Sequence, residues 1–177
     1  MNDDAPFHEY YDLGDLGRNG AELTIAADAD DRARIARWAG LTSVESFDAK
    51  VRLKKHSNSR FALEGEFTAD VTQECVVTLE PVRSRIEREV HRELHLTQAT
   101  RHRPQESLEL AAGAGDDEVP EEIESLEYDL AAPLLEELSL ALDPYPRAPG
   151  VEFDAPAEPE AKPESPFAVL KSLKKPG

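Results

Sequence analysis

Residues 60–74 read RFALEGEFTADVTQE, and this stretch decides the fold. Its apolar side chains recur at every second position, which is the period of a β-strand with one buried face. The buried face is expected to carry Phe61, Leu63, Phe67, Ala69 and Val71. Gly65 falls in the same register, where it permits either a bulge or the close packing of another element.

A second strand of period two precedes this one. Residues 43–56, SVESFDAKVRLKKH, carry apolar side chains at Val44, Phe47, Val51 and Leu53, and we expect a bulge near residues 47–49. The sequence SNS at Ser57–Ser59 indicates a turn. The two strands are therefore predicted to form a hairpin.

A third strand is predicted after the crossing segment CVVTLEPV at 75–82. Residues 83–97, RSRIEREVHRELHLT, place apolar side chains at even positions, namely Ile86, Val90, Leu94 and Leu96. Three of these positions are also spaced by four, so a helix competes with the strand on periodicity alone.

Short strands are further expected at Phe7–Tyr11 and over residues 21–27, with a glycine-rich turn between them. A helix is predicted from Asp30 to Ala39, capped by Asp28 or Asp30, with Ile35 and Trp38 near its apolar side and Gly40 ending it. A second helix follows from a stripe at helical spacing, ended by Pro144 and Pro146. The stripe consists of Leu130, Leu134, Leu135, Leu138 and Leu142.

The resulting fold class is α+β: a mainly antiparallel sheet with one helix in the N-terminal half and one in the C-terminal half. We expect one domain over residues 1–147, which includes a flexible acidic loop at about 111–127. Residues 148–177 are expected to form a proline-rich acidic linker that carries a short terminal helix.

The net charge of -17 and the pI near 4.6 argue against an ordinary nucleic-acid binder, which is usually basic. The one cysteine, Cys75, excludes an intramolecular disulfide and fits a reducing cytoplasm. The acidic N-terminus lacks the apolar segment of a secretory signal. No apolar run is long enough for a transmembrane helix, so no membrane partner is expected.

Charge is unevenly distributed along the chain. Residues 111–161 hold fifteen acidic side chains and one basic one, whereas residues 50–60 hold five basic side chains and no acid. We expect the basic stretch to approach RNA through Lys50, Arg52, Lys54, Lys55 and Arg60. Two alternatives stay open: a solvated hairpin edge protected by lysines, and a basic face screened by the acidic half of the chain.

No catalytic constellation, cofactor motif or metal site is predicted. His91 and His95 would project from one strand face about 13 Å apart, too far for shared metal ligation. A lone cysteine beside two valines is more often a small buried side chain than a nucleophile. The acidic run at 116–122 lacks the ligand spacing of a calcium loop.

The C-terminal sequence SPFAVLKSLKK is more specific. Ser165 and Pro166 form a helix start signal, after which an apolar strip and late lysines follow. So short a helix needs a surface, either on its own domain or on a partner. The residues expected to bind a partner are Phe167, Val169, Leu170, Lys171, Leu173, Lys174 and Lys175.

Several motifs together resemble the YceD family, the large ribosomal RNA subunit accumulation proteins. They are DDRARIARWAGLTSVESFDAKVRL at 30–53, ECVVTLEPV at 74–82, EYDLAAPLLEELSLALDPYPRAPG at 127–150 and SPFAVLKSLKK at 165–175. The resemblance favours the strand at 83–97. Many members carry Cys-x-Arg-Cys where this chain reads Cys75-Val76-Val77-Thr78, so a metal or redox role of the paired cysteines does not carry over.

The resemblance implies a cytoplasmic, non-enzymatic factor in ribosome biogenesis. It would support accumulation or processing of large-subunit ribosomal RNA by binding that RNA, a basic ribosomal protein, or both. The alternative is an acidic, chaperone-like binder of a basic ribosomal protein that never touches RNA. The sequence leaves the oligomeric state open.

Overall fold

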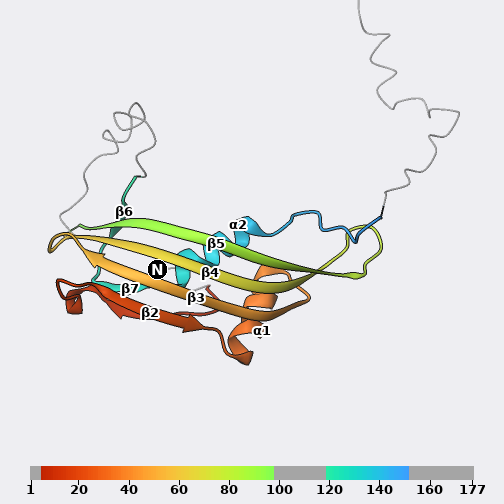
Figure 1. Ribbon diagram of the computed structural model, residues 1–177, viewed down its shortest axis with the longest axis horizontal. Helices are drawn as coiled ribbons and strands as arrows, with labels where there is room; N and C mark the ends of the chain where they lie inside the picture. The colour runs from red at the N-terminus through yellow and green to blue at the C-terminus, as the bar shows by residue number, and fades with distance from the viewer. Residues whose placement is uncertain (1–4, 98–118, 152–177) are drawn as a thin grey trace, which may run out of the picture.

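The computed structural model describes residues 5–97 and 119–151. A five-stranded sheet runs in the order β2-β3-β4-β5-β6, and β1 pairs with β7 in a separate two-stranded sheet (Figure 1). The elements are β1 (Tyr10–Asp12), a 3-10 turn (Leu13–Asp15), β2 (Ala21–Ala26), α1 (Ala29–Ala39), β3 (Ser43–Lys55), β4 (Arg60–Glu74), β5 (Pro81–Leu96), β6 (Glu121–Ile123), β7 (Glu127–Asp129) and α2 (Ala131–Ala141).

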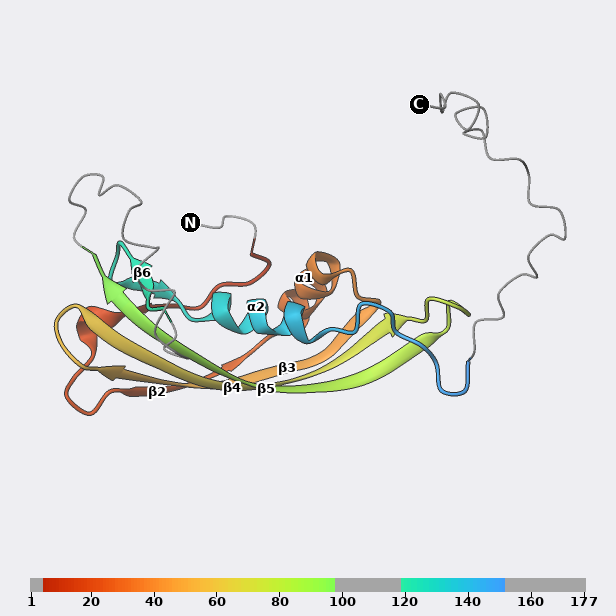
Figure 2. The same cartoon turned by 90° about the horizontal axis from the view of Figure 1, so that it is seen from above.

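Strands β2 to β5 are antiparallel neighbours, and the short β6 adds to β5 in parallel. The sheet is curved, and both helices lie on its concave side (Figure 2). The predicted α+β class and the two predicted helices are confirmed. The strand over residues 83–97 is also confirmed, and the competing helix is wrong, because this stretch pairs with β4 along its whole length.

The hairpin of β3 and β4 sets the register of the sheet. Its pairing starts with Lys55 opposite Phe61 at the predicted turn, where the His56 and Ser57 amides donate to the Arg60 carbonyl. Because side chains alternate between faces, this register sends the large apolar residues of both strands to the concave side. We call this side the inner face and the opposite side the outer face.

Packing on the inner face explains Gly65. The ladder passes through Val51 and Gly65 without a register shift, so the glycine does not form a bulge. A Cβ atom there would lie 3.5 Å from Cδ2 of Leu134, on α2. The absent side chain therefore lets the helix approach the sheet, which is the second of the two roles expected from sequence.

The bulge of β3 lies between Val44 and Ser46, so the expectation of a bulge near residues 47–49 is wrong. The extra residue is Glu45, whose carboxylate accepts hydrogen bonds from the hydroxyls of Ser43 and Thr72. These bonds hold the pKa of Glu45 below its ordinary value. The bulge thus supplies a hydrogen-bond acceptor for the hydroxyl of Thr72, a buried residue.

Helix α1 begins at Ala29, one residue before the predicted start, and ends at Ala39 as predicted. Asp28 is the N-cap and forms a capping box with Asp31, and Gly40 ends the helix in the left-handed conformation. Its core contacts differ from the expectation in one respect. Ile35 is fully buried, but Trp38 is 42% exposed, because only one narrow stripe of the helix meets β3.

The short strands differ from the expectation in two places. The first strand lies at Tyr10–Asp12, three residues later than expected, and pairs with β7. Part of the expected flexible loop forms β6 and the first residue of β7, because Leu94–Leu96 offers Glu121–Ile123 an open edge. Residues 111–118 of that loop, and the expected terminal helix, lie outside the described residues.

Helix α2 closes the core. Its residues Leu134, Leu135 and Leu138 are buried as predicted, as is Leu130 just before it, whereas Leu142 is only partly buried. Proline residues follow directly, and the chain crosses the β4–β5 end of the sheet, where the Val76 amide donates to the Pro146 carbonyl.

Among the glycines that the structure describes, Gly20, directly before β2, should be the least replaceable. Its φ is +73°, and a Cβ atom would lie 2.2 Å from the Leu53 carbonyl oxygen. We predict that Gly20→Ala lowers the free energy of unfolding by about 1–3 kcal/mol or more, since both the conformation and the contact are unfavourable. The measurement is urea unfolding followed by circular dichroism.

The matched control is Gly17→Ala, in the same turn, where a Cβ atom would meet nothing within 4 Å. Equal losses of stability in the two variants would contradict this account.

Candidate macromolecule-binding face of the sheet

The predicted RNA-binding cations occupy two faces of the sheet. Lys50, Arg52 and Lys54 alternate along β3 on the outer face, in register with outer-face residues of β4. Lys55 falls on the inner side, where its ammonium lies 5.9 Å from the centre of the Phe61 ring. Arg60 begins β4 on the outer side, opposite His95. The structure therefore brings four of the five cations onto one face.

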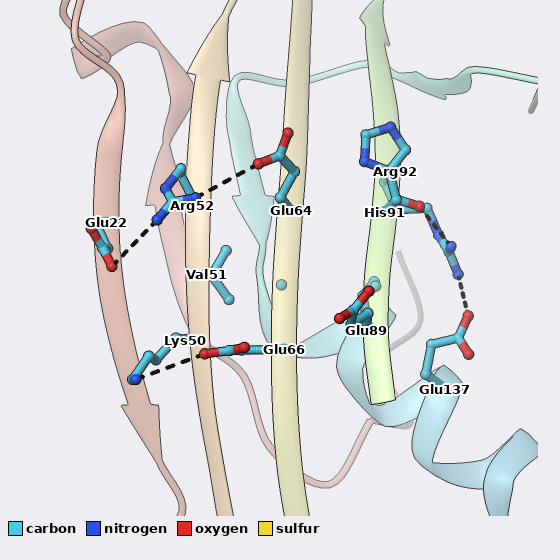
Figure 3. Close-up of a pocket in the computed structure, with 12 residues that line it drawn as sticks. Glu22, Lys50, Val51, Arg52, Glu64, Glu66, Glu89, His91, Arg92 and Glu137 are labelled. Carbon is cyan, nitrogen blue, oxygen red and sulfur yellow. Dashed lines mark hydrogen bonds and ion pairs between the residues drawn. The ribbon is translucent and has the colours of Figure 1, made fainter. Parts of the chain in front are cut away.

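Carboxylates lie between these cations (Figure 3). Lys50 Nζ is 3.7 Å from an oxygen of Glu66, and Arg52 lies between Glu22 at 3.8 Å and Glu64 at 4.0 Å. The cause is the ladder itself, which places Glu66 directly opposite Lys50 and Glu64 directly opposite Arg52. Lys50 and Arg52 are thus ion-paired rather than freely available to phosphate.

Lys54 reaches diagonally to the same carboxylate and donates a hydrogen bond to Glu64. That hydrogen bond, with the nearby charges of Lys54 and Arg52, lowers the pKa of Glu64. Glu64 therefore stays ionised at neutral pH. It neutralises part of the charge of Lys50, Arg52 and Lys54, which we call the cationic column. Such exposed pairs contribute little to stability, but they cancel the local field that would attract an anion.

A shallow hollow of about 520 Å³ runs across this face. Its charged lining includes Glu89 and His91 from β5 in addition to the pairs already described (Figure 3). Small-molecule sites are mostly apolar with a few polar groups, and this lining is the reverse. The hollow therefore lacks the lining that is typical of a small-molecule site.

Two predicted cations remain without a carboxylate within 4.0 Å in the part of the chain that the structure describes: Lys55 and Arg60. They flank the turn at residues 56–59, where the exposed His56 and Asn58 also lie. This turn is the one place on the β3–β4 hairpin where positive charge is not offset by its cross-strand neighbours.

The predicted partner-binding residues of the tail lie outside the described residues. They are Phe167, Val169, Leu170, Lys171, Leu173, Lys174 and Lys175. Their role stays a prediction.

Sequence reasoning missed the ion pairs between β5 and α2. Arg92 on β5 points to the inner side and lies 3.1 Å from Glu136 and 3.3 Å from Glu137. No sequence signal links these positions, which are more than forty residues apart. The pairing of Glu64 and Glu66 with β3 did have a signal, since a turn at 57–59 fixes which residues of the two strands face each other.

Cys75 is buried, as expected for a small apolar side chain. Its sulfur also accepts hydrogen bonds from the amides of Thr78 and Ala148, at 3.5 and 3.3 Å. Hydrogen bonding, first from the Thr78 side chain and then from the Ala148 amide, lowers the pKa of the thiol to about 7. The sulfur therefore joins the β4–β5 turn to the segment that follows α2.

Within residues 5–97 and 119–151, no group of three or more histidine, cysteine or acidic side chains is placed to hold a metal ion. The two histidines at positions 91 and 95 lie on one strand, as predicted. No helix of the same residues is long and apolar enough to cross a membrane.

These features define a small α+β protein with a charged, open sheet face backed by two helices. The family model described as large ribosomal RNA subunit accumulation protein YceD matches residues 63–174. The chain belongs to the YceD family, which is named for accumulation of the large ribosomal RNA and not for an enzymatic activity. No curated protein and no solved structure matches the chain.

Removing the carboxylates should reveal the cationic column. We predict that Glu64→Gln combined with Glu66→Gln strengthens binding to a ribosomal RNA fragment by about tenfold at low salt, because the substitutions release Lys50, Arg52 and Lys54. Filter binding over a range of salt concentrations measures the effect.

The control neutralises two exposed acids elsewhere, Asp15→Asn with Glu74→Gln, and has the same net charge. If the control and test variants gain RNA affinity equally, the effect comes from overall charge and the local ion pairs have no part in it.

Proposed function

We propose that this protein supports the accumulation or processing of large-subunit ribosomal RNA in the cytoplasm by binding a basic ribosomal protein, without catalysing a reaction. Membership of the YceD family supports the ribosomal role. The single observation that favours a protein partner over RNA is the pairing of Lys50, Arg52 and Lys54 with carboxylates on the outer face.

Electrostatics supports the same choice. A chain of net charge -17 repels RNA at long range and attracts a basic protein. In the described part of the chain, an exposed acidic group lies around β6 and β7, and none of its members has an ion-pair partner within 4.0 Å. It consists of Glu122, Glu124 and Glu127.

In this role the acidic surface would shield a basic client until ribosomal RNA competes for it. The tail would supply an apolar anchor through Phe167, Val169, Leu170 and Leu173. Lys171, Lys174 and Lys175 would add attraction to phosphate once the complex reaches RNA. Both statements about the tail rest on its amphipathic sequence alone.

The test of the acidic surface uses substitutions, because residues 121–123 and 127–129 are strands and a deletion would disturb the fold. We predict that Glu122→Gln/Glu124→Gln/Glu127→Gln weakens binding to purified basic large-subunit proteins by about tenfold at low salt. Calorimetry or fluorescence anisotropy at two salt concentrations measures the affinity.

The control is Asp15→Asn/Glu74→Gln/Glu80→Gln, which removes three exposed acids from other places. An unchanged affinity in the test variant would remove the acidic surface from the proposal. A full chain that binds no basic ribosomal protein at all would refute the proposed function.

A second candidate is direct RNA contact by Lys50, Arg52, Lys54, Lys55 and Arg60. The observation in its favour is that Lys55 and Arg60, beside the turn at 56–59, have no carboxylate within 4.0 Å among the described residues. A turn of this kind can reach a phosphate backbone ahead of the neutralised sheet face.

If RNA binds there, we predict that Lys55→Ala/Arg60→Ala reduces the slope of log affinity against log salt by about 1.5, as expected for two lost phosphate contacts. The control is Arg37→Ala/Arg147→Ala, which removes two exposed arginines near the opposite end of the sheet, where the chain after α1 and the chain after α2 meet β4 and the β4–β5 turn. The same slope in wild type and test variant would rule out this contact.

A further inference from the structure

The edge of β5 is open over most of its length. The strand spans Pro81–Leu96 and pairs with β4 throughout, but β6 covers only Leu94–Leu96 on its other side. In the described part of the chain, no strand pairs with the remaining edge (Figure 1). A long unpaired edge is a template for another strand unless the protein uses or protects it.

Hydrogen bonding shows which residues face this edge. The Leu96 amide donates to Ser59 on the β4 side, and the next amide, of Thr97, donates to Ile123 on the β6 side. The backbone N–H and C=O groups of successive residues in a strand point alternately to its two sides. The odd-numbered residues of β5 therefore point their amides and carbonyls to the open edge.

Side chains occupy two of these edge carbonyls in place of a strand. Arg88 Nη1 donates to the Glu87 carbonyl at 3.1 Å, and Arg92 Nη1 donates to the His91 carbonyl at 2.9 Å. These edge carbonyls are thus accessible to donors from outside the sheet, and in a strand pair the Arg88 side chain would give way at Glu87 to a backbone amide.

The outer-face charges of the edge follow a simple order: Arg83, Arg85, Glu87, Glu89. Arg85 bonds Glu87 and lies near Asp70. Within the described residues, Arg83 and Glu89 have no oppositely charged partner within 4.0 Å. Two charges of opposite sign thus stand unpaired at the two ends of this row.

We infer that a second copy of this chain pairs antiparallel with β5 about a two-fold axis at Ile86, joining two sheets into one. In this register Arg83 faces the partner's Glu89, and Arg85 faces the partner's Glu87. By symmetry each pair occurs twice. The row is therefore complementary to itself in charge.

The inner face agrees with the same register. Ile86 would meet its own copy and Val82 the partner's Val90, so apolar residues lie opposite apolar residues, while Ser84 would meet the partner's Arg88. A two-fold axis perpendicular to a sheet preserves its faces, so the helices of both copies lie on one side. The joined sheet keeps one helix-covered face and one charged face.

Backbone geometry selects this register too. The facing residues 83 with 89 and 85 with 87 are all odd-numbered, so each pair exchanges two hydrogen bonds, about eight in the dimer. At the ends, Pro81 faces the partner's His91. Proline has no amide to donate, so the ladder ends at this pair.

Neighbouring registers are worse. An axis at Arg85 would set that residue against itself, and an axis at Arg88 would set Glu87 against the partner's Glu89. An axis at Glu87 would place Ile86 against the partner's Arg88. Charged edges discourage indiscriminate pairing, and this order of charges discourages every nearby register except one.

Charge reversal and its rescue test the inference. Glu89→Arg would oppose Arg83 with a like charge twice per dimer, and Arg83→Glu would do the same with Glu89. We expect sedimentation equilibrium of the full chain to show a dimer, which either single variant weakens by about tenfold or more. The double variant Arg83→Glu/Glu89→Arg restores the pairs and should dimerise as the wild type does.

The matched control is Glu22→Arg, the same change on the same face but on β2 at the opposite edge of the sheet. It should leave the dimer unchanged. Circular dichroism confirms that each variant is folded. A wild-type chain that stays monomeric at every concentration overturns the inference, as does loss of the dimer in Glu22→Arg alone or failure of the double variant to recover it. None of these results depends on the proposed ribosomal role.

Discussion

The register of the β3–β4 hairpin is the constraint on which the other features depend. It sends Leu53 and Leu63 to the inner face, where α2 packs over Gly65, and at the same time sets Lys50 against Glu66 on the outer face. A slip by one residue would expose the core and bury the charges, so the apolar face fixes the charge pattern as a by-product. Core and surface chemistry are thus two results of one alignment.

Charge in this protein is balanced locally and unbalanced globally. On the outer face each lysine or arginine of β3 has a carboxylate neighbour, while the chain as a whole carries -17. A field of that sign favours a basic partner, and the paired sheet face offers RNA little attraction. The family to which the chain belongs is named for accumulation of the large ribosomal RNA, and we infer from the order of charges on β5 a surface that suits a second copy.

Much of the fold follows from local sequence. Alternation over residues 60–74 and 83–97, the turn at 57–59, and the capping signals of α1 are properties of neighbouring residues, so they are visible without tertiary contacts. The short strands β6 and β7 have no such signal. Three-residue segments rich in acidic side chains become strands only because another part of the chain presents an open edge.

The sequence by itself determined the strand and helix periods, the positions of the core residues, the net charge and the family to which the motifs point. Tertiary structure decided where charges meet. Cross-strand register decides whether Lys50 is free or paired and whether Lys55 shares its face. The shortness of β6 decides how much of the β5 edge stays open. Composition counts charges along a chain, whereas their effect depends on distances across a sheet.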